Sequence, residues 1–162
     1  MGLKLKLAWI DSAGNLQVLS YYNRRTKSGW TSLASDISTI GNNYPNYAEV
    51  STTLRNSFIS WADEEVLMYQ NASVSISSAM INVFVGVGVD GVTIIASGYS
   101  TNNAAANYKT MTLTTNKTGL TEAAIHYATL LGSSNSATLP TYYGASLGAD
   151  GAGCRIGVTI KG

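Results

Sequence analysis

The feature that most constrains this fold is a long alternating stretch, ASVSISSAMINVFVGVGV, at residues 72–89. Small polar residues alternate there with Val, Ile and Phe, and a period of two is typical of β-strands. Asp90-Gly91 follows, and the apolar run VTIIASG comes directly after it. Asp and Gly both tolerate positive φ, so this pair between two apolar runs predicts a tight hairpin. The sequence therefore predicts antiparallel β-structure here.

Further strands are expected on both sides of this hairpin. Residues 110–115, TMTLTT, alternate, and residues 154–162, CRIGVTIKG, form a closing strand. At the other end, residues 3–10 alternate Lys and Leu, the DSAGN segment has turn chemistry, and residues 16–22 form the return strand. Several short strands separated by Gly and Asn predict a mainly β fold, an antiparallel sandwich.

One or two short helices are expected in the N-terminal half. Residues 31–40 place apolar side chains at helical spacing ahead of Gly41, and residues 47–69 place them at spacings of four, four and three. The first group is Leu33, Ile37 and Ile40, and the second is Val50, Leu54, Phe58 and Trp61.

No repeat and no charged or Pro-rich linker divides the 162 residues, so one domain is expected. Within it, residues 1–70 are expected to form the N-terminal hairpin and a mixed docking region. Residues 71–162 are expected to form the β-sandwich portion.

Residues 124–132, AIHYATLLG, contain the single histidine, His126, and fit two structures. Ala and Leu favour a helix. Strand alternation also fits, with His126 and Leu130 on one side and Tyr127 and Leu131 on the other. As a helix the segment could line a site, whereas as a strand it would belong to a β-shell.

Composition argues against several function classes. Only 12% of residues are charged, about half of the usual share, and the net charge is +1, so no long-range field attracts nucleic acid. The longest apolar run, residues 81–98, is interrupted by Asp90 and is too short to span a bilayer. One Cys and one His cannot complete a tetrahedral zinc site, so no metal or other cofactor is expected. Cys154 is expected to be a small buried side chain.

Two short motifs resemble binding or acid–base sites but favour structural roles. Gly86, Gly88 and Gly91 match the dinucleotide fingerprint G-x-G-x-x-G, yet a β-branched run follows where a helix must begin. Close packing in a hairpin is the favoured interpretation. The acidic run DEE, residues 63–65, points adjacent side chains in different directions, which favours a solvated face.

The GASLG segment, residues 144–148, matches the nucleophile elbow G-x-S-x-G. That motif needs an acid and then a histidine further along, but only Asp150 follows it and His126 lies upstream. A loop between strands is therefore favoured, and no catalytic residue is expected. A serine hydrolase that uses Ser146 and His126 is the least favoured alternative.

Loop tyrosines and a basic loop are the remaining candidate contacts. Flat amphipathic rings can stack on sugars or fill subunit contacts, and half-buried packing at sheet ends is the alternative. Arg24, Arg25 and Lys27 form a candidate docking loop that could meet phosphate or an acidic partner, although a solvated loop is the favoured interpretation. The tyrosine pairs are Tyr21–Tyr22, Tyr44–Tyr47 and Tyr142–Tyr143. The first and last pairs, together with His126, are the preferred glycan or interface contacts.

Three C-terminal segments resemble the C-terminal part of bacteriophage fibre and decoration proteins. They are GLTEAAIHYATLLG at 119–132, LPTYYG at 139–144 and CRIGVTIKG at 154–162. The segment VFVGVGVDGVTIIASGY, residues 83–99, is similar to the inner strands of those proteins. Those proteins carry trimeric jelly-roll heads related in shape to the tumour-necrosis-factor and C1q modules.

The resemblance implies an antiparallel jelly-roll-like β-sandwich in which residues 124–132 are a strand and His126 lies near a subunit contact. It implies a non-enzymatic virion protein on the particle surface that self-associates, as a homotrimer, and stabilises the particle or attaches it to a host surface. Its expected partners are further copies of the chain, other virion proteins and a host-surface glycan. By elimination, residues 1–70 would dock on the particle. A small carbohydrate-binding β-sandwich is the alternative.

Overall fold

The computed structural model describes residues 7–10, 16–19, 26–39, 44–77, 81–102, 108–121, 124–144 and 153–161. These residues form strands and connections, with no helix among them, and therefore no helix that could cross a membrane. The strands are β1 (Leu7–Ile10), β2 (Leu16–Leu19), β3 (Lys27–Ser32), β4 (Ile37–Ser38), β5 (Ala48–Glu49), β6 (Arg55–Ile59), β7 (Glu65–Ser75), β8 (Ile81–Val89), β9 (Thr93–Asn102), β10 (Tyr108–Lys117), β11 (Ile125–Ser134), β12 (Thr141–Tyr142) and β13 (Arg155–Lys161).

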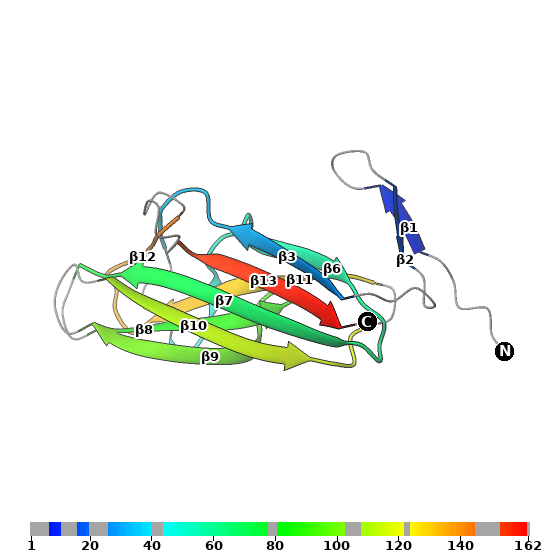
Figure 1. The fold of residues 1–162 in the computed structure, drawn as a ribbon. Helices are drawn as coiled ribbons and strands as arrows, with labels where there is room; N and C mark the ends of the chain where they lie inside the picture. Colours follow the sequence, from blue (N-terminus) through cyan, green and yellow to red (C-terminus); the bar gives the residue numbers. More distant parts are fainter. Residues whose placement is uncertain are drawn as a thin grey trace.

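Two antiparallel sheets form the body of the molecule (Figure 1). The first, called the β7 sheet, has the order β3-β13-β7-β12-β4, and β10 pairs with β7 along its other edge. The second, called the β8 sheet, has the order β5-β11-β8-β9, and β6 also pairs with β11. Strands β1 and β2 pair with each other as a hairpin. The predicted antiparallel sandwich is confirmed.

The core lies between the two sheets and follows from strand alternation. Val66, Met68 and Val74 of β7 are buried, and Val85 and Val87 of β8 are buried as well. Successive side chains of a strand point to opposite faces, so one row from each sheet meets in the middle. Full burial of one such side chain contributes roughly 1.5–3 kcal/mol, so these rows hold the layers together.

The Asp-Gly hairpin forms as predicted between β8 and β9. Asp90 has φ of 54° and Gly91 has φ of 112°, the left-handed region that both residue types tolerate. The ladder closes at the Val89–Thr93 pair and contains a bulge after Val87. The hairpin therefore fixes the order of these two strands, and the bulge shifts their register by one residue.

Residues 125–134 are a strand, which confirms the β interpretation of the histidine segment. His126 pairs with Phe58, and Leu130 pairs with Val87. Both side chains are buried, and Leu130 is 0% exposed. His126 and Leu130 therefore share one side of β11, as alternation predicted, and the structure shows that this side faces the core.

The predicted helices over 31–40 and within 47–69 are wrong. Residues 33–36 connect β3 to β4, and the second segment forms β5, β6 and the start of β7. Its apolar side chains at helical spacing are buried, but in different elements. A turn in which Leu54 N donates to Ser51 O separates β5 from β6. Strand pairing with β11 therefore overrides the helical spacing, as tertiary context commonly does.

The sandwich begins at β3 and not at residue 71. Strand β3 belongs to the β7 sheet and β6 belongs to the β8 sheet. The first residues of β7 pair with β13. Leu33, Val50 and Leu54 belong to the core. The described residues of 27–70 are thus part of the β-framework, so the β-sandwich portion is not confined to residues 71–162 as expected.

Candidate functional site

His126 is buried in β11 and is held by two acceptors. Its Nδ1 lies 2.7 Å from Asp90 Oδ2, and its Nε2 lies 3.0 Å from the carbonyl oxygen of Thr121. The Phe58 ring packs beside it, with ring centroids 5.8 Å apart. The other oxygen of Asp90 accepts a hydrogen bond of 3.1 Å from Tyr127 N. The exposed turn of the β8–β9 hairpin is thereby tied to β11.

These partners favour the protonated form of His126. A carbonyl and a carboxylate oxygen only accept, so both ring nitrogens can donate at once only in the imidazolium. Burial lowers the pKa of His126, but the hydrogen bonds to Thr121 and Asp90 and the negative charge of Asp90 outweigh it, so the pKa is raised above its usual value of 6.5. His126 is the buried half of an ion pair.

We expect Asp90→Asn to lower the free energy of unfolding at pH 5.5 by about 1 kcal/mol, because it weakens a charge-assisted hydrogen bond. Asn tolerates the left-handed turn and keeps an acceptor for Tyr127 N, so the backbone is matched. Because the pKa of His126 is raised in the folded protein, its contribution to stability is fully present below pH 6.5, the usual pKa of histidine. This contribution is lost as the pH rises through the raised pKa of the folded protein.

Urea unfolding of both proteins at pH 5.5 and 8.5 checks this. The stability difference between them should shrink at the higher pH. A difference that stays constant or grows between these two values would contradict the ion pair.

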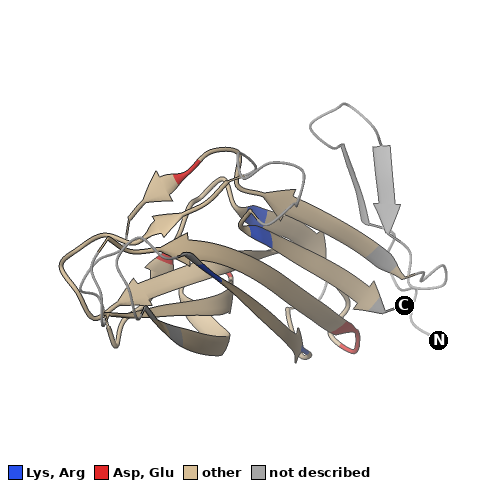
Figure 2. Cartoon of the chain, turned by 60° about the vertical axis from the view of Figure 1, so that its left-hand side comes forward, with Lys and Arg blue, Asp and Glu red and all other residues tan. Residues whose placement is uncertain are grey.

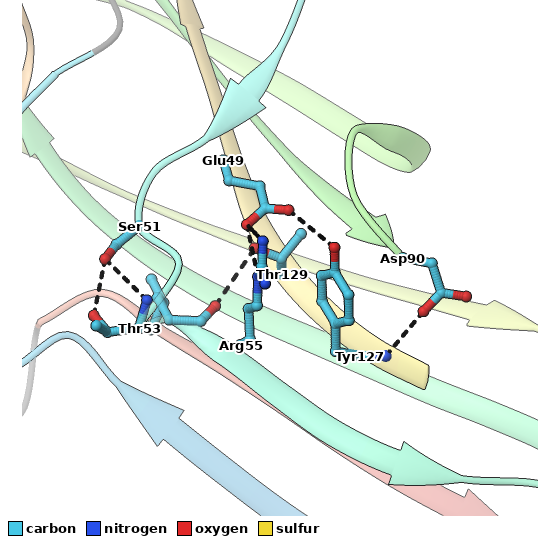
Figure 3. A network of polar contacts seen from close by, with 8 residues as sticks. Glu49, Ser51, Thr53, Arg55, Asp90, Tyr127 and Thr129 are labelled. Atoms are coloured by element: carbon cyan, nitrogen blue, oxygen red, sulfur yellow. Dashed lines mark hydrogen bonds and ion pairs between the residues drawn. The ribbon is translucent and has the colours of Figure 1, made fainter. Parts of the chain in front are cut away.

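A second polar cluster lies on the outer face of the β8 sheet (Figure 3). Arg55 Nε donates to Glu49 Oε2 at 2.8 Å, and Tyr127 Oη donates to Glu49 Oε1 at 3.3 Å. The Arg55 guanidinium carbon also lies 4.3 Å from the centre of the Tyr127 ring. These contacts join β5, β6 and β11 and neutralise the charges of that face.

The contacts around His126 and Cys154 join neighbouring strands. Both His126 nitrogens are occupied, so neither is free to take a proton from a serine hydroxyl. Burial raises the pKa of the Cys154 thiol to about 11, and its Sγ donates to Ser73 O at 3.3 Å, so it is a protonated, buried side chain as expected. Within the described ranges, no three His, Cys, Asp or Glu side chains gather as metal ligands.

The predicted tyrosine contacts divide into three outcomes. Tyr142 is 0% exposed, so its prediction as a surface or interface contact is wrong. It pairs with Ile37 and Val74 inside the β7 sheet, and burial raises the pKa of its hydroxyl. Tyr143 is partly buried, and its hydroxyl lies 2.8 Å from Ser75 Oγ. Residues Tyr21 and Tyr22 lie outside the described residues.

The predicted basic docking loop is mostly outside the described residues. Arg24 and Arg25 are not described, and Lys27 is the first residue of β3, where its backbone pairs with Ile160. The grouping of the three basic side chains therefore stays a prediction.

The glycine motifs have structural roles. A Cβ on Gly88 would lie 2.5 Å from the Gly91 carbonyl oxygen, so no side chain fits there. Gly144, the first residue of the GASLG motif, is buried, and a Cβ on it would lie 2.6 Å from the Ser35 backbone. Ser146 lies outside the described residues. The acidic run is also not a simple solvated face, because Glu64 is 6% exposed and accepts from Trp61 N at 2.7 Å.

Sequence reasoning missed two aromatic residues that face the surface together. Phe84 of β8 and Tyr99 of β9 are direct cross-strand partners, and Tyr44 stacks on Phe84. The Asp-Gly turn indicates that β8 pairs with β9, and the partner of each residue can be estimated by counting residues outward from the turn on both strands. The bulge after Val87 shifts that count by one residue, so only the structure gives the partners.

No protein-family model matches the chain, and no curated protein matches it. Among similar solved structures is that of the infectious bursal disease virus Gx strain, with a TM-score of 0.43 and 10% identity over 99% of this chain and 41% of that chain. The structure of the Gt strain of the same virus has a TM-score of 0.43 and 8% identity, and the match covers 96% of this chain and 41% of that chain. The structure of dimeric latent PorU from Porphyromonas gingivalis has a TM-score of 0.40 and 8% identity, and the match covers 83% of this chain and 12% of that chain. This chain thus spans less than half the length of each of these three.

Proposed function

We propose that this chain is a non-enzymatic virion structural protein that assembles with copies of itself. The observation that carries the proposal is strand order. The strands of five or more residues run β3-β13-β7-β10 in one sheet and β6-β11-β8-β9 in the other, all antiparallel. This arrangement supports a jelly roll, an eight-stranded double sheet that viral capsid proteins and lectins use. The C-terminal resemblance to phage fibre and decoration proteins points the same way.

The occupied His126 nitrogens and the protonated Cys154 support a role without catalysis. The surface supports it too. Figure 2 shows the Lys, Arg, Asp and Glu residues of the described part of the chain at a few scattered positions along the ribbon. A weakly charged surface suits a protein whose free-energy gain comes from burial between subunits.

Exposed aliphatic side chains suggest where copies meet. Val92 is 57% exposed, Ile94 42% and Ile125 69%. Val92 lies in the β8–β9 turn and Ile94 is the second residue of β9. Ile125 begins β11 two residues before Tyr127, whose carbonyl accepts a hydrogen bond from Asp90 N. All three therefore lie at one end of the β8 sheet. In the proposal this turn-end patch forms the contact of a homotrimer.

The docking portion is narrower in the proposal than residues 1–70. Residues 27–70 build the sandwich, so the region that can dock on the particle is the segment before β3, which includes the β1–β2 hairpin. Attachment to a host surface is the second role in the proposal.

Self-association is tested by light scattering coupled to size exclusion on the full chain. We expect a mass about three times the 17.1 kDa of one chain. The double substitution Val92→Ser with Ile125→Ser should reduce the mass to that of one chain. The matched control Leu139→Ser removes a side chain that is 50% exposed at the opposite end of β11, and it should leave the mass unchanged. A parent chain that elutes with the mass of one copy would refute self-association.

A further inference from the structure

Three aromatic rings form a shelf on the outer face of the β8 sheet. Tyr44 and Phe84 are stacked with centroids 4.2 Å apart and planes at 17°, and Phe84 and Tyr99 lie 5.7 Å apart at 37°. Tyr44 is 53% exposed and Tyr99 is 68% exposed. Such exposure is unusual for stacked rings, because aromatic side chains gain most when they are buried. The aromatic shelf is the set Tyr44, Phe84 and Tyr99.

Strand pairing holds the shelf in place. Phe84 and Tyr99 are opposite each other on β8 and β9, which lie side by side along one edge of the sandwich (Figure 1). Tyr44 N donates to Ser134 O at 3.1 Å, which anchors the third ring over the end of β11. The rings are therefore fixed by backbone hydrogen bonds before any ligand arrives, so little ordering entropy is lost on binding.

A rim of uncharged polar groups lies beside the shelf. Asn82 and Thr101 form the next outward-facing pair along the β8–β9 ladder, and Thr101 Oγ1 donates to Asn82 Oδ1 at 2.7 Å. Asn82 N donates to Asn135 Oδ1 at 3.0 Å. The side-chain NH2 groups of both asparagines make no hydrogen bond within the described part of the chain, so they remain available as donors. The charged side chains described in this sheet are paired, Glu49 with Arg55 and Asp90 with His126.

We propose that the aromatic shelf and its rim bind a neutral saccharide. A hexopyranose ring has one face of C–H groups, which packs on an exposed aromatic ring, and an edge of hydroxyls, which pairs with amides. Flat rings beside oriented amides supply both kinds of contact at once. Because the charged groups described in this sheet are paired with each other, a neutral sugar is favoured over a sialylated or phosphorylated one. The inference rests on the attachment role in the proposed function and names its ligand.

The test uses the full chain on an array of neutral oligosaccharides built from hexoses and N-acetylhexosamines, followed by calorimetric titration of the best binder. We expect Tyr99→Ala to weaken the affinity about tenfold, from loss of one stacked ring. Tyr99→Phe should keep the affinity within about twofold, since the ring remains. Asn82→Asp should weaken it as well, because the variant keeps the size but replaces the NH2 donor with a charged acceptor.

The matched control is Trp30→Ala. Trp30 is 55% exposed and packs on Tyr69 in the β7 sheet, so it is a comparable ring on the other sheet. It should leave sugar binding unchanged. Silence of the parent chain on the array would overturn the inference, and so would equal affinities of the parent chain and Tyr99→Ala.

If Tyr99→Ala instead lowers the mass measured by light scattering, the shelf is a contact between copies and the saccharide inference fails. That result would leave the proposed self-association standing, so the two failures are distinguishable.

Discussion

Leu130→Ala should lower the free energy of unfolding by about 3 kcal/mol, the usual cost of a buried leucine plus the cavity it leaves. Leu130 is 0% exposed and lies opposite Val87 on the inward face of the β8 sheet. It belongs to the core cluster that includes Met68 and Ile156 of the β7 sheet. Removal of its side chain therefore weakens the contact between the two layers. Urea unfolding followed by tryptophan fluorescence at one fixed protein concentration measures the change.

Thr114→Ala is the control for this experiment. Thr114 is exposed on β10 and lies opposite Tyr69 in the β7 sheet. It should change the free energy of unfolding by about 0.5 kcal/mol or less, as surface substitutions usually do. Equal effects of the two substitutions would mean that Leu130 does not join the two layers.

Gly88→Ala should destabilise the protein by about 2 kcal/mol, the cost of overpacking a site that cannot relax. The added carbon would lie 2.5 Å from the Gly91 carbonyl oxygen and 2.9 Å from Leu131 Cδ1. The first of these atoms belongs to the backbone of the turn, so it cannot move without disturbing the hairpin. Thermal and urea unfolding both report the loss.

Gly29→Ala is the matched substitution in another strand. A Cβ on Gly29 would lie 3.5 Å from the nearest atom of Asn56, an ordinary contact. We expect a change within about 0.5 kcal/mol for this variant. If Gly88→Ala were as mild as Gly29→Ala, the close approach of β8 to its own turn would be disproved.

The β8–β9 hairpin was predictable because its determinants are local. The Asp90–Gly91 pair requires positive φ at two successive residues, and no other dipeptide of the 72–98 stretch offers this so readily. Alternation also placed His126 and Leu130 on one side of a possible strand, and the structure shows that this side faces inward. These two signals predicted the antiparallel sandwich. The strand assignment of residues 124–132 also needed the resemblance to phage fibre and decoration proteins, because helix propensity fitted that segment equally well.

The errors come from contacts between distant segments. Val50, Leu54 and Phe58 have helical spacing, yet all three are buried in the core. The backbone of each one also has a partner in β11, more than 65 residues away in the chain. Tyr142 resembles a loop residue, but Gly132 leaves room for its hydroxyl inside the core, where a Cβ would clash with the Tyr142 ring. No local pattern encodes such long-range complementarity.

The candidate site was predictable only in part. The single histidine and the Asp-Gly turn were both noted, but their contact depends on the pairing of β11 with β8, which brings Asp90 to His126. The aromatic shelf escaped for the same reason, since Phe84 and Tyr99 meet only through a bulged register. Tyr44 was noted as a loop tyrosine, without its partners.

Immunogold electron microscopy on intact virions from a source that encodes this chain tests the proposed role most directly. The account predicts gold at the particle surface and copies of the chain that remain with the particles after purification. Particles free of label and of this protein, with the chain present only in the lysed host, would contradict it.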